Sequence, residues 1–171
     1  MKIAVVTDST AYLTKEEYAE YGIYVLPMSV IFGQETYREE IDITAEEFYA
    51  KVKSSPVFPT STQPAVGETY ELFHELAKDY DAIIPITISS GISGTYQTCV
   101  AVAEDMKDEV AIYPIDSEIS CAPQARAVKL AAIMAKSGEY SPEEIVETVQ
   151  RLVDRTTAYF IVDDLSNLQR G

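Results

Sequence analysis

Residues 81–97, DAIIPITISSGISGTYQ, decide the fold of this chain. The uninterrupted apolar run from Ile83 to Ile88 is typical of a strand that is covered on both faces of a parallel sheet. The next seven residues are Ser, Gly, Ile and Thr without a single charge, and a helix-like segment follows from Thr95. A strand, a short loop and a helix in this order predict one unit of a parallel α/β sheet.

The same alternation continues on both sides of this unit. Strands are expected in residues 3–6, 23–32 with an interruption at Pro27, 33–39, 109–116 and 157–165. Helices are expected in residues 13–22, 42–53, 65–80, 95–106, 123–136 and 141–156. Three of these helices begin with the spacing of a capping box, at Thr14, Thr44 and Ser141. We therefore expect one α/β domain over residues 1–171, with a mostly parallel sheet and helices on both faces.

Composition limits the partners and the location of the chain. The formal net charge is −15, which argues against nucleic acid and anionic membranes, since both are bound by basic patches. The sequence has no apolar run of the ~18 residues that a transmembrane helix needs. Asp8 interrupts the first apolar run too early for a signal peptide. A cytoplasmic protein is expected, with Cys99 and Cys121 as reduced thiols in the core.

Polar loops follow four of the predicted strands, in VVTDST, TISSGIS, YPIDSEIS and FIVDDLS. Ligands of open parallel sheets sit at the carboxyl ends of the strands, so these loops are expected to share one edge and to line one site. The alternative is that their Asp and Ser residues only cap helices. A magnesium site is a further alternative, with ligands from the strand-end residues Asp8, Asp116, Asp163 and Asp164. Most zinc sites are excluded, because the chain has one histidine and two separated cysteines.

Two kinds of chemistry fit the neutral loop poorly. A phosphate loop would read G-x-x-x-x-G-K-[ST], but the chain has no Lys or Arg from Tyr80 through Met106. A nucleophile elbow would read G-x-S-x-G, but Thr95 stands where the last glycine belongs. The only histidine, His74, lies in the middle of a helix, where we expect a surface or boundary position. A serine hydrolase or acyltransferase that uses Ser93 is the alternative from another functional class.

A small anion held by neutral donors suits the loop better. A glycine-rich turn that enters a helix exposes backbone N–H groups, and the helix dipole favours negative charge there. Residues 59–64, PTSTQP, supply a second set of hydroxyls just before another helix. A carboxylate that accepts several hydrogen bonds stays ionised without a cationic partner. The two loops favour a carboxylate ligand, the alternative being that both are only capped helix starts.

The motifs together resemble those of the DegV family. TDST, PMSVIFGQETYRE, DITAEEFY, TSTQP, SSGISGTYQ, IDSEIS and FIVDDLSNLQRG occur in the order expected of that family, over essentially the whole chain. The resemblance implies a bacterial binding protein, not an enzyme, that takes a long-chain fatty acid such as palmitate and needs no cofactor or metal. The family includes the B subunits of bacterial fatty acid kinase, which present the fatty acid to a separate ATP-binding subunit. The missing nucleotide motif agrees with such a role.

Carried over residue by residue, the resemblance implies which groups hold the carboxylate. They are Ser61 and Thr62 in the first loop and Ser93 with Gly94 in the second. The first loop reads Ser-Thr-Gln-Pro where Thr-Ser-Gln-Pro is the commoner form, so which hydroxyl contacts the ligand stays open. Family members continue into a second domain that shares the acyl tunnel and is absent from this chain. We expect the apolar surface left open to favour a homodimer.

Overall fold

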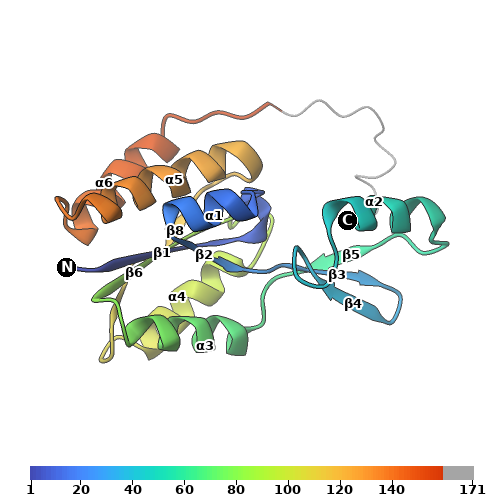
Figure 1. The fold of residues 1–171 in the computed structure, drawn as a ribbon, viewed down its shortest axis with the longest axis horizontal. Coiled ribbons are helices and arrows are strands. Elements are labelled where there is room, and N and C mark those ends of the chain that lie inside the picture. The colour runs from blue at the N-terminus through green and yellow to red at the C-terminus, as the bar shows by residue number, and fades with distance from the viewer. Residues whose placement is uncertain (160–171) are drawn as a thin grey trace.

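The computed structural model describes residues 1–159 and contains two sheets (Figure 1). The described pairings of the larger sheet are all parallel, in the order β2-β1-β6-β7, with β8 also paired to β6. Its strands are β1 (Ile3–Asp8), β2 (Ile23–Leu26), β6 (Ala82–Thr87), β7 (Ala111–Ile112) and β8 (Ile115–Asp116). The expected α/β architecture with a mostly parallel sheet is confirmed.

Helices cover both faces of the parallel sheet, as predicted (Figure 1). On one face lie α1 (Lys15–Tyr21), α5 (Cys121–Ser137) and α6 (Pro142–Val153). On the other face lie α3 (Val66–Ala77) and α4 (Thr95–Asp105). A short 3-10 helix, Ser9–Ala11, follows β1. We call the parallel sheet with its helices the body.

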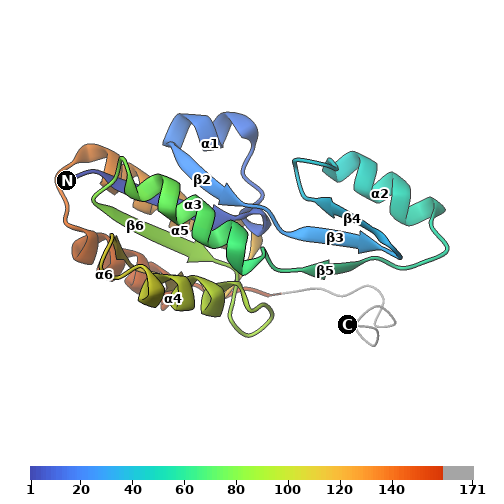
Figure 2. The same ribbon diagram turned by 90° about the horizontal axis from the view of Figure 1, so that it is seen from below.

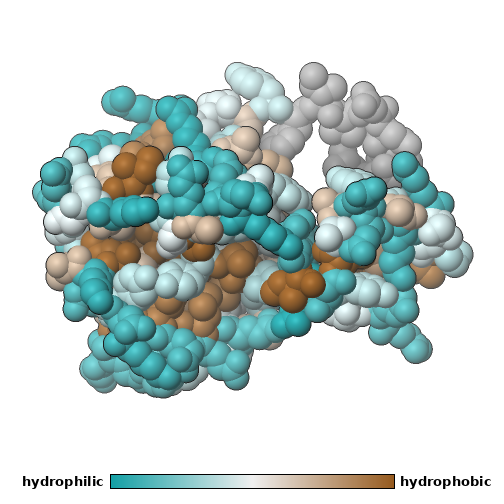
Figure 3. Space-filling model, viewed as in Figure 1, coloured by the Kyte–Doolittle hydropathy of each residue, from teal (hydrophilic) through white to brown (hydrophobic). Residues whose placement is uncertain are grey.

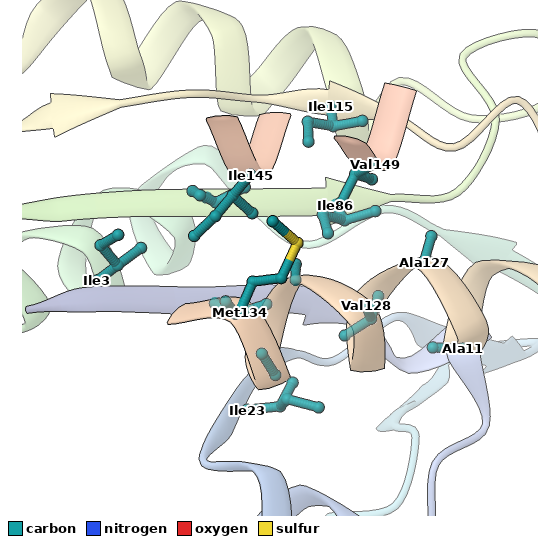
Figure 4. Packing of buried hydrophobic residues seen from close by; sticks show 14 of the residues in the cluster. Ile3, Ala11, Ile23, Ile86, Ile115, Ala127, Val128, Met134, Ile145 and Val149 are labelled. Atoms are coloured by element: carbon teal, nitrogen blue, oxygen red, sulfur yellow. The ribbon is translucent and has the colours of Figure 1, made fainter. Parts of the chain in front are cut away.

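Alternate residues of β6 face opposite layers of the core. Ile84 and Ile86 belong to the cluster with Val128 of α5 and Ile145 of α6, part of which Figure 4 shows. Ile83 belongs to the other cluster, beneath α3 and α4. Burying such a side chain contributes about 1.5–3 kcal/mol. The strand is therefore fixed from both sides, and this holds the start of the neutral loop in place.

The predicted helix signals form as expected. All three capping boxes are present, at Thr14, Thr44 and Ser141, each with a glutamate three residues on. Gly22 ends α1 in the left-handed conformation with φ of 67°. Each cap satisfies backbone N–H groups that would otherwise lack a partner, and this contributes about 1 kcal/mol per helix.

The smaller sheet is antiparallel and has the order β4-β3-β5. It consists of β3 (Ser29–Phe32), β4 (Glu35–Arg38) and β5 (Thr60–Thr62). Together with α2 (Ala45–Ser54) it forms a lobe that projects from the body, and we call this lobe the arm (Figure 2). The arm has its own hydrophobic cluster around Val30, Phe32 and Ile43, separate from the two clusters of the body.

The arm corrects two predictions. Residues 23–32 were expected to be one strand-like run interrupted by Pro27, and the interruption proves larger than expected, because β2 ends in the body at Leu26 and β3 begins in the arm at Ser29. Pro27 lies between the two strands and has no N–H for a ladder, which explains the break. Residues 60–62, expected within a loop, form the third strand of the arm by pairing with β3.

Two more strands were expected, over residues 109–116 and 157–165. Residues 109–116 contain two short strands, β7 and β8, and the break falls at Pro114, which has no N–H to continue the ladder. In the strand expected over 157–165, residues 160–165 lie outside the described residues, and 157–159 have no regular structure.

The cysteine prediction holds for one of the two residues. Both thiols are free, and Cys99 is completely buried in the cluster beneath α3 and α4. The prediction for Cys121 is wrong, because this residue is exposed at the start of α5. None of the helices within residues 1–159 combines the length and the apolar character needed to cross a membrane.

Candidate ligand-binding site

Three of the four polar strand-end loops meet at one edge of the body. The backbone N–H of Ile88 donates to Asp8 Oδ2 at 2.7 Å, which joins the loop after β6 to the end of β1. The N–H of Ser90 donates to Asp116 Oδ1 at 3.1 Å, which joins the same loop to the end of β8. The predicted convergence is confirmed for these three loops. The fourth, FIVDDLS at residues 160–166, lies outside the described residues.

Asp8 is a structural anchor of this edge. Its side chain is fully buried, and its oxygens accept hydrogen bonds from the backbone N–H of Thr10, from Gln124 Nε2 and from Ile88 N–H. Asp116 Oδ1 likewise accepts from the backbone N–H of Ser90 in the loop after β6 and from the N–H of Glu118 in its own loop. Protein donors therefore occupy these carboxylates. Within residues 1–159, no group of three or more His, Cys, Asp or Glu side chains is placed to hold a metal ion.

A hollow of about 630 Å³ opens between this edge and the arm, and we call it the hydroxyl hollow. All four residues predicted to hold a carboxylate line it. The arm side supplies Glu39, Ser61, Thr62 and Gln63. The body side supplies Thr10, Tyr12, Ile88, Ile92, Ser93 and Gly94, and Met28 lies between the two. Two loops that are about 30 residues apart in the sequence thus face one space.

Gln63 fastens the two loops together. Its Nε2 donates to Thr98 Oγ1 in α4 at 2.8 Å, and its side chain lies directly against the backbone of Gly94. A Cβ at position 94 would stand 2.2 Å from Gln63 Oε1, a distance that real Cβ atoms do not reach. The glycine is therefore required for this close approach, since its φ of −82° is open to any residue.

Ser93 presents its hydroxyl at the first turn of α4. Ser93 Oγ accepts from the backbone N–H of Thr95 at 3.3 Å and lies 2.9 Å from Thr95 Oγ1. Thr95 itself is buried, with 1% of its surface exposed. No His, Asp or Glu side chain of residues 1–159 is hydrogen-bonded to Ser93. A serine nucleophile needs a base within hydrogen-bond reach, so the hydrolase alternative finds no support in this geometry.

His74 lies away from the hydroxyl hollow, as expected of a surface residue. It stacks on Tyr70, with ring centroids 6.1 Å apart, and its Nδ1 is 3.1 Å from Glu109 Oε2. Both partners of this contact are about half exposed. A histidine in this position belongs to the outer surface of α3 and takes no part in the site.

Glu39 and Tyr12 are residues of the hollow that the sequence did not reveal. Glu39 is its one charged lining residue within the described chain, and it accepts a hydrogen bond from Ser9 Oγ at 2.6 Å. Partial burial, reinforced by the Glu39 carboxylate, raises the pKa of Tyr12 to about 12, so its hydroxyl stays protonated at neutral pH. Both residues come from elements far from the two motif loops. Glu39 stands at the end of the motif PMSVIFGQETYRE and Gln63 stands in TSTQP, but neither side chain was predicted to line the site.

Comparison with known proteins identifies the family. The family model described as "Uncharacterised protein, DegV family" matches residues 2–171. The chain belongs to the DegV family. Among curated DegV relatives, Protein DegV of Bacillus subtilis strain 168 is 48% identical over 171 residues, which are 100% of this chain and 60% of that protein. The chain thus spans less than two thirds of the length of this DegV relative.

Solved DegV structures agree with the fold. The crystal structure of DegV from Bacillus subtilis, described as a fatty acid binding protein, matches with a TM-score of 0.95 and 47% identity over 100% of this chain and 60% of that chain. A fatty acid binding DegV family protein from Streptococcus agalactiae matches with a TM-score of 0.81 and 30% identity over 90% of this chain and 54% of that chain. The resemblance seen in the sequence motifs is therefore confirmed.

Proposed function

We propose that this protein binds a long-chain fatty acid, with the carboxylate held in the hydroxyl hollow by Ser61 and Thr62 on one side and Ser93 with Gly94 on the other. The observation that carries the proposal is the fastening of the two loops, in which Gln63 packs on Gly94 and brings both sets of hydroxyls to one space. Related DegV proteins whose structures are described as fatty acid binding support it.

The donors of the hollow suit one negative charge. Hydroxyl and backbone N–H groups that bond to a charged acceptor contribute about 1.5–3 kcal/mol each. The first turn of α4, an eleven-residue helix, adds the positive end of its dipole where Ser93 and Gly94 stand. Among residues 1–159, no Lys or Arg lines the hollow, which suits a singly charged carboxylate better than a phosphate ester.

Presentation to a kinase is the finer form of this proposal. The B subunits of fatty acid kinase bind the lipid without doing the phosphoryl transfer, and this chain has no phosphate-loop motif of its own. We propose a cytoplasmic carrier of palmitate or a neighbouring chain length that hands the carboxylate to a separate ATP-binding subunit. An exposed apolar side chain of the hollow, Ile92 at 72%, belongs to the surface on which a second copy or another domain would pack.

Native mass spectrometry tests the proposed ligand. The protein is expressed from its complete gene in a bacterial host, purified without detergent and sprayed under native conditions. We expect a second mass that exceeds the first by myristate, palmitate or stearate, and denaturing conditions should release it. A single mass that stays unchanged after incubation with palmitate would contradict the proposed function.

A further inference from the structure

A groove of about 660 Å³ runs between α1 and α5 on one face of the body. The two helices lie side by side on this face (Figure 1). Both follow a strand of the parallel sheet at its carboxyl edge, so they run in the same direction. We call the outer surface of α1 and α5, with the groove between them, the α1/α5 face. Apolar side chains make up much of the lining of the groove: Leu13, Tyr21, Leu130, Ile133 and Leu152.

The apolar side chains of the α1/α5 face remain in contact with solvent. Ile133, on the outer side of α5, is 55% exposed. Tyr21 and Leu130 are only partly buried against the core cluster below them. Figure 3 shows hydrophobic residues that reach the surface over the helices of the body, amid a mostly hydrophilic surface. A single exposed isoleucine is ordinary, but one that continues a partly buried apolar seam is typical of a surface that another chain covers.

The charges of the α1/α5 face are separated by sign. α5 carries three positive charges and no acidic residue over its 17 residues: Arg126, Lys129 and Lys136. The chain as a whole has 28 acidic and 13 basic residues, so a helix of this length without an acid is a local exception. α1 is mostly acidic and carries three glutamates and one lysine: Glu16, Glu17, Glu20 and Lys15. A basic row thus runs beside an acidic row, with the apolar seam between them.

Part of this charge has no partner within one molecule. Lys129 is paired with Glu17 across the groove. Lys136 donates to the backbone carbonyl of Glu20 at 3.0 Å, which leaves the Glu20 carboxylate without an ion pair among residues 1–159. Arg126 lines the groove but has no hydrogen bond or ion pair to any residue that the structure describes. A guanidinium offers a planar set of donors that matches a carboxylate, so Arg126 is available to an acidic residue of another chain.

We propose that a second copy of this chain packs on the α1/α5 face. An interface between identical copies has to be self-complementary, because the same patch contributes both sides. A twofold axis that lies in the interface, parallel to the two helices and between them, places α5 of each copy over α1 of the other. The basic row then meets the acidic row twice, and the two apolar seams meet at the centre. A partner with charges of one sign would be repelled by either α1 or α5, so a second copy fits this face better.

The pair of Lys129 with Glu17 sets the register of the proposed contact. It shows which turns of α1 and α5 lie at the same level along the groove. Arg126 stands one turn before Lys129, at the level of the first turn of α1. The twofold axis keeps this level, so Arg126 of one copy lies opposite Glu16 of the second copy.

The proposed dimer leaves the candidate ligand site open. Tyr12 is the only described residue that lines both the groove and the hydroxyl hollow. Ile92 lines the hollow and not the groove, so the apolar surface beside the hollow stays available to another domain. The inference is therefore independent of the proposed function and adds an assembly state to it.

Analytical ultracentrifugation tests the dimer on the protein expressed from its complete gene. We expect a monomer–dimer equilibrium that weakens as salt screens the facing charges. Arg126→Glu puts like charges opposite each other twice in every dimer, so it should weaken self-association about tenfold or more, and Glu16→Arg should do the same. Lys107→Glu, the same charge reversal at an exposed position after α4 on the other side of the sheet, is the matched control and should leave self-association unchanged.

Mixing the two variants provides the sharpest measurement. A mixed dimer of Arg126→Glu with Glu16→Arg again pairs opposite charges at both contacts, so the mixture should dimerise under conditions where each variant alone stays monomeric. Ile133→Ser tests the apolar seam without changing a charge, and it should also weaken the dimer. A wild-type protein that stays monomeric, a dimer that none of these substitutions weakens, or a mixture that fails to recover would each overturn the proposed interface.

Discussion

The side-chain amide of Gln63 occupies the space that any side chain at position 94 would need. This contact joins the arm to the start of α4 and sets the distance between the two hydroxyl loops. A methyl group at position 94 would displace Gln63 and break its hydrogen bond to Thr98. The relationship explains why a glycine stands at the N-cap of α4, a position where a hydroxyl residue is otherwise favoured.

Gly94→Ala should therefore disturb both stability and ligand binding. We expect a loss of about 0.5–1.5 kcal/mol in the free energy of unfolding, because the flexible Gln63 side chain has to move aside and gives up its hydrogen bond to Thr98. Urea denaturation measures this loss, and fatty acid affinity should fall with it. Gly91→Ala is the control, since its Cβ would meet only Ser89 Oγ at an ordinary 3.4 Å. Equal stability of the two variants would show that Gln63 moves away without cost.

Glu39→Gln should strengthen the binding of a fatty acid. Glu39 puts a negative charge on the wall of the hydroxyl hollow, where it repels a carboxylate. Two like charges in close proximity oppose each other by about 1 kcal/mol even in water, so we expect roughly fivefold tighter binding of palmitate. Titration calorimetry provides the affinity, and the methyl ester of palmitate, which has no charge, serves as the control. An affinity for palmitate that falls in the variant would argue that Glu39 supports the ligand.

Asp8→Asn should destabilise the body without acting on a ligand directly. The Asp8 carboxylate accepts hydrogen bonds from three separate parts of the chain, and an amide nitrogen in its place would face at least one of those donors. A buried donor left without an acceptor costs about 1–3 kcal/mol, which urea denaturation detects. Asp108→Asn, on an exposed turn, should leave the free energy of unfolding unchanged. A similar small effect for both variants would contradict the anchoring role.

The two thiols should differ in reactivity. Cys121 is exposed, whereas burial, followed by the Asp8 charge, raises the pKa of Cys99 from 9.0 to about 12. At pH 8 a disulfide reagent should titrate one thiol quickly and the second only after unfolding. The raised pKa also makes the free energy of unfolding depend on pH. The contribution of the neutral, buried Cys99 thiol is complete below pH 9, the pKa in the unfolded chain, and is lost as the pH rises toward 12. Cys99→Ala should reduce that alkaline loss, and equal reaction rates of both thiols in the native protein would contradict the assigned burial.

Local patterns in the sequence predicted the helix starts and the parallel sheet well. Capping boxes at Thr14, Thr44 and Ser141 form because they depend only on residues within one turn. The continuous apolar run of β6 required two covered faces, and the structure supplies them. The parallel arrangement of the strands also predicted that the loops after β1, β6 and β8 would meet, since parallel strands place their carboxyl ends at one edge of the sheet.

The arm was harder to predict because its contacts are non-local. β5 has the sequence Thr-Ser-Thr with all three residues exposed, and it becomes a strand only through its partner β3, about 30 residues earlier. The hydroxyl loops were predicted, but Tyr12 and Glu39 were not, because each enters the hollow from a separate element. Whether Ser61, Thr62, Ser93 and Gly94 contact a ligand stays a prediction that only binding data can test.

The most direct test of the account compares acid and ester binding in one double variant. Ser93→Ala combined with Thr62→Ala removes one hydroxyl from each loop, and displacement of a fluorescent fatty acid measures the affinity for palmitate and for its methyl ester. We predict that the affinity for palmitate falls about tenfold or more, because the charged carboxylate loses hydrogen bonds, while the affinity for the ester changes little. Ser90→Ala is the control, because Ser90 does not line the hollow, and it should change neither affinity. An unchanged affinity for palmitate in the double variant, with the fold intact, would contradict the claim that these two loops hold the carboxylate.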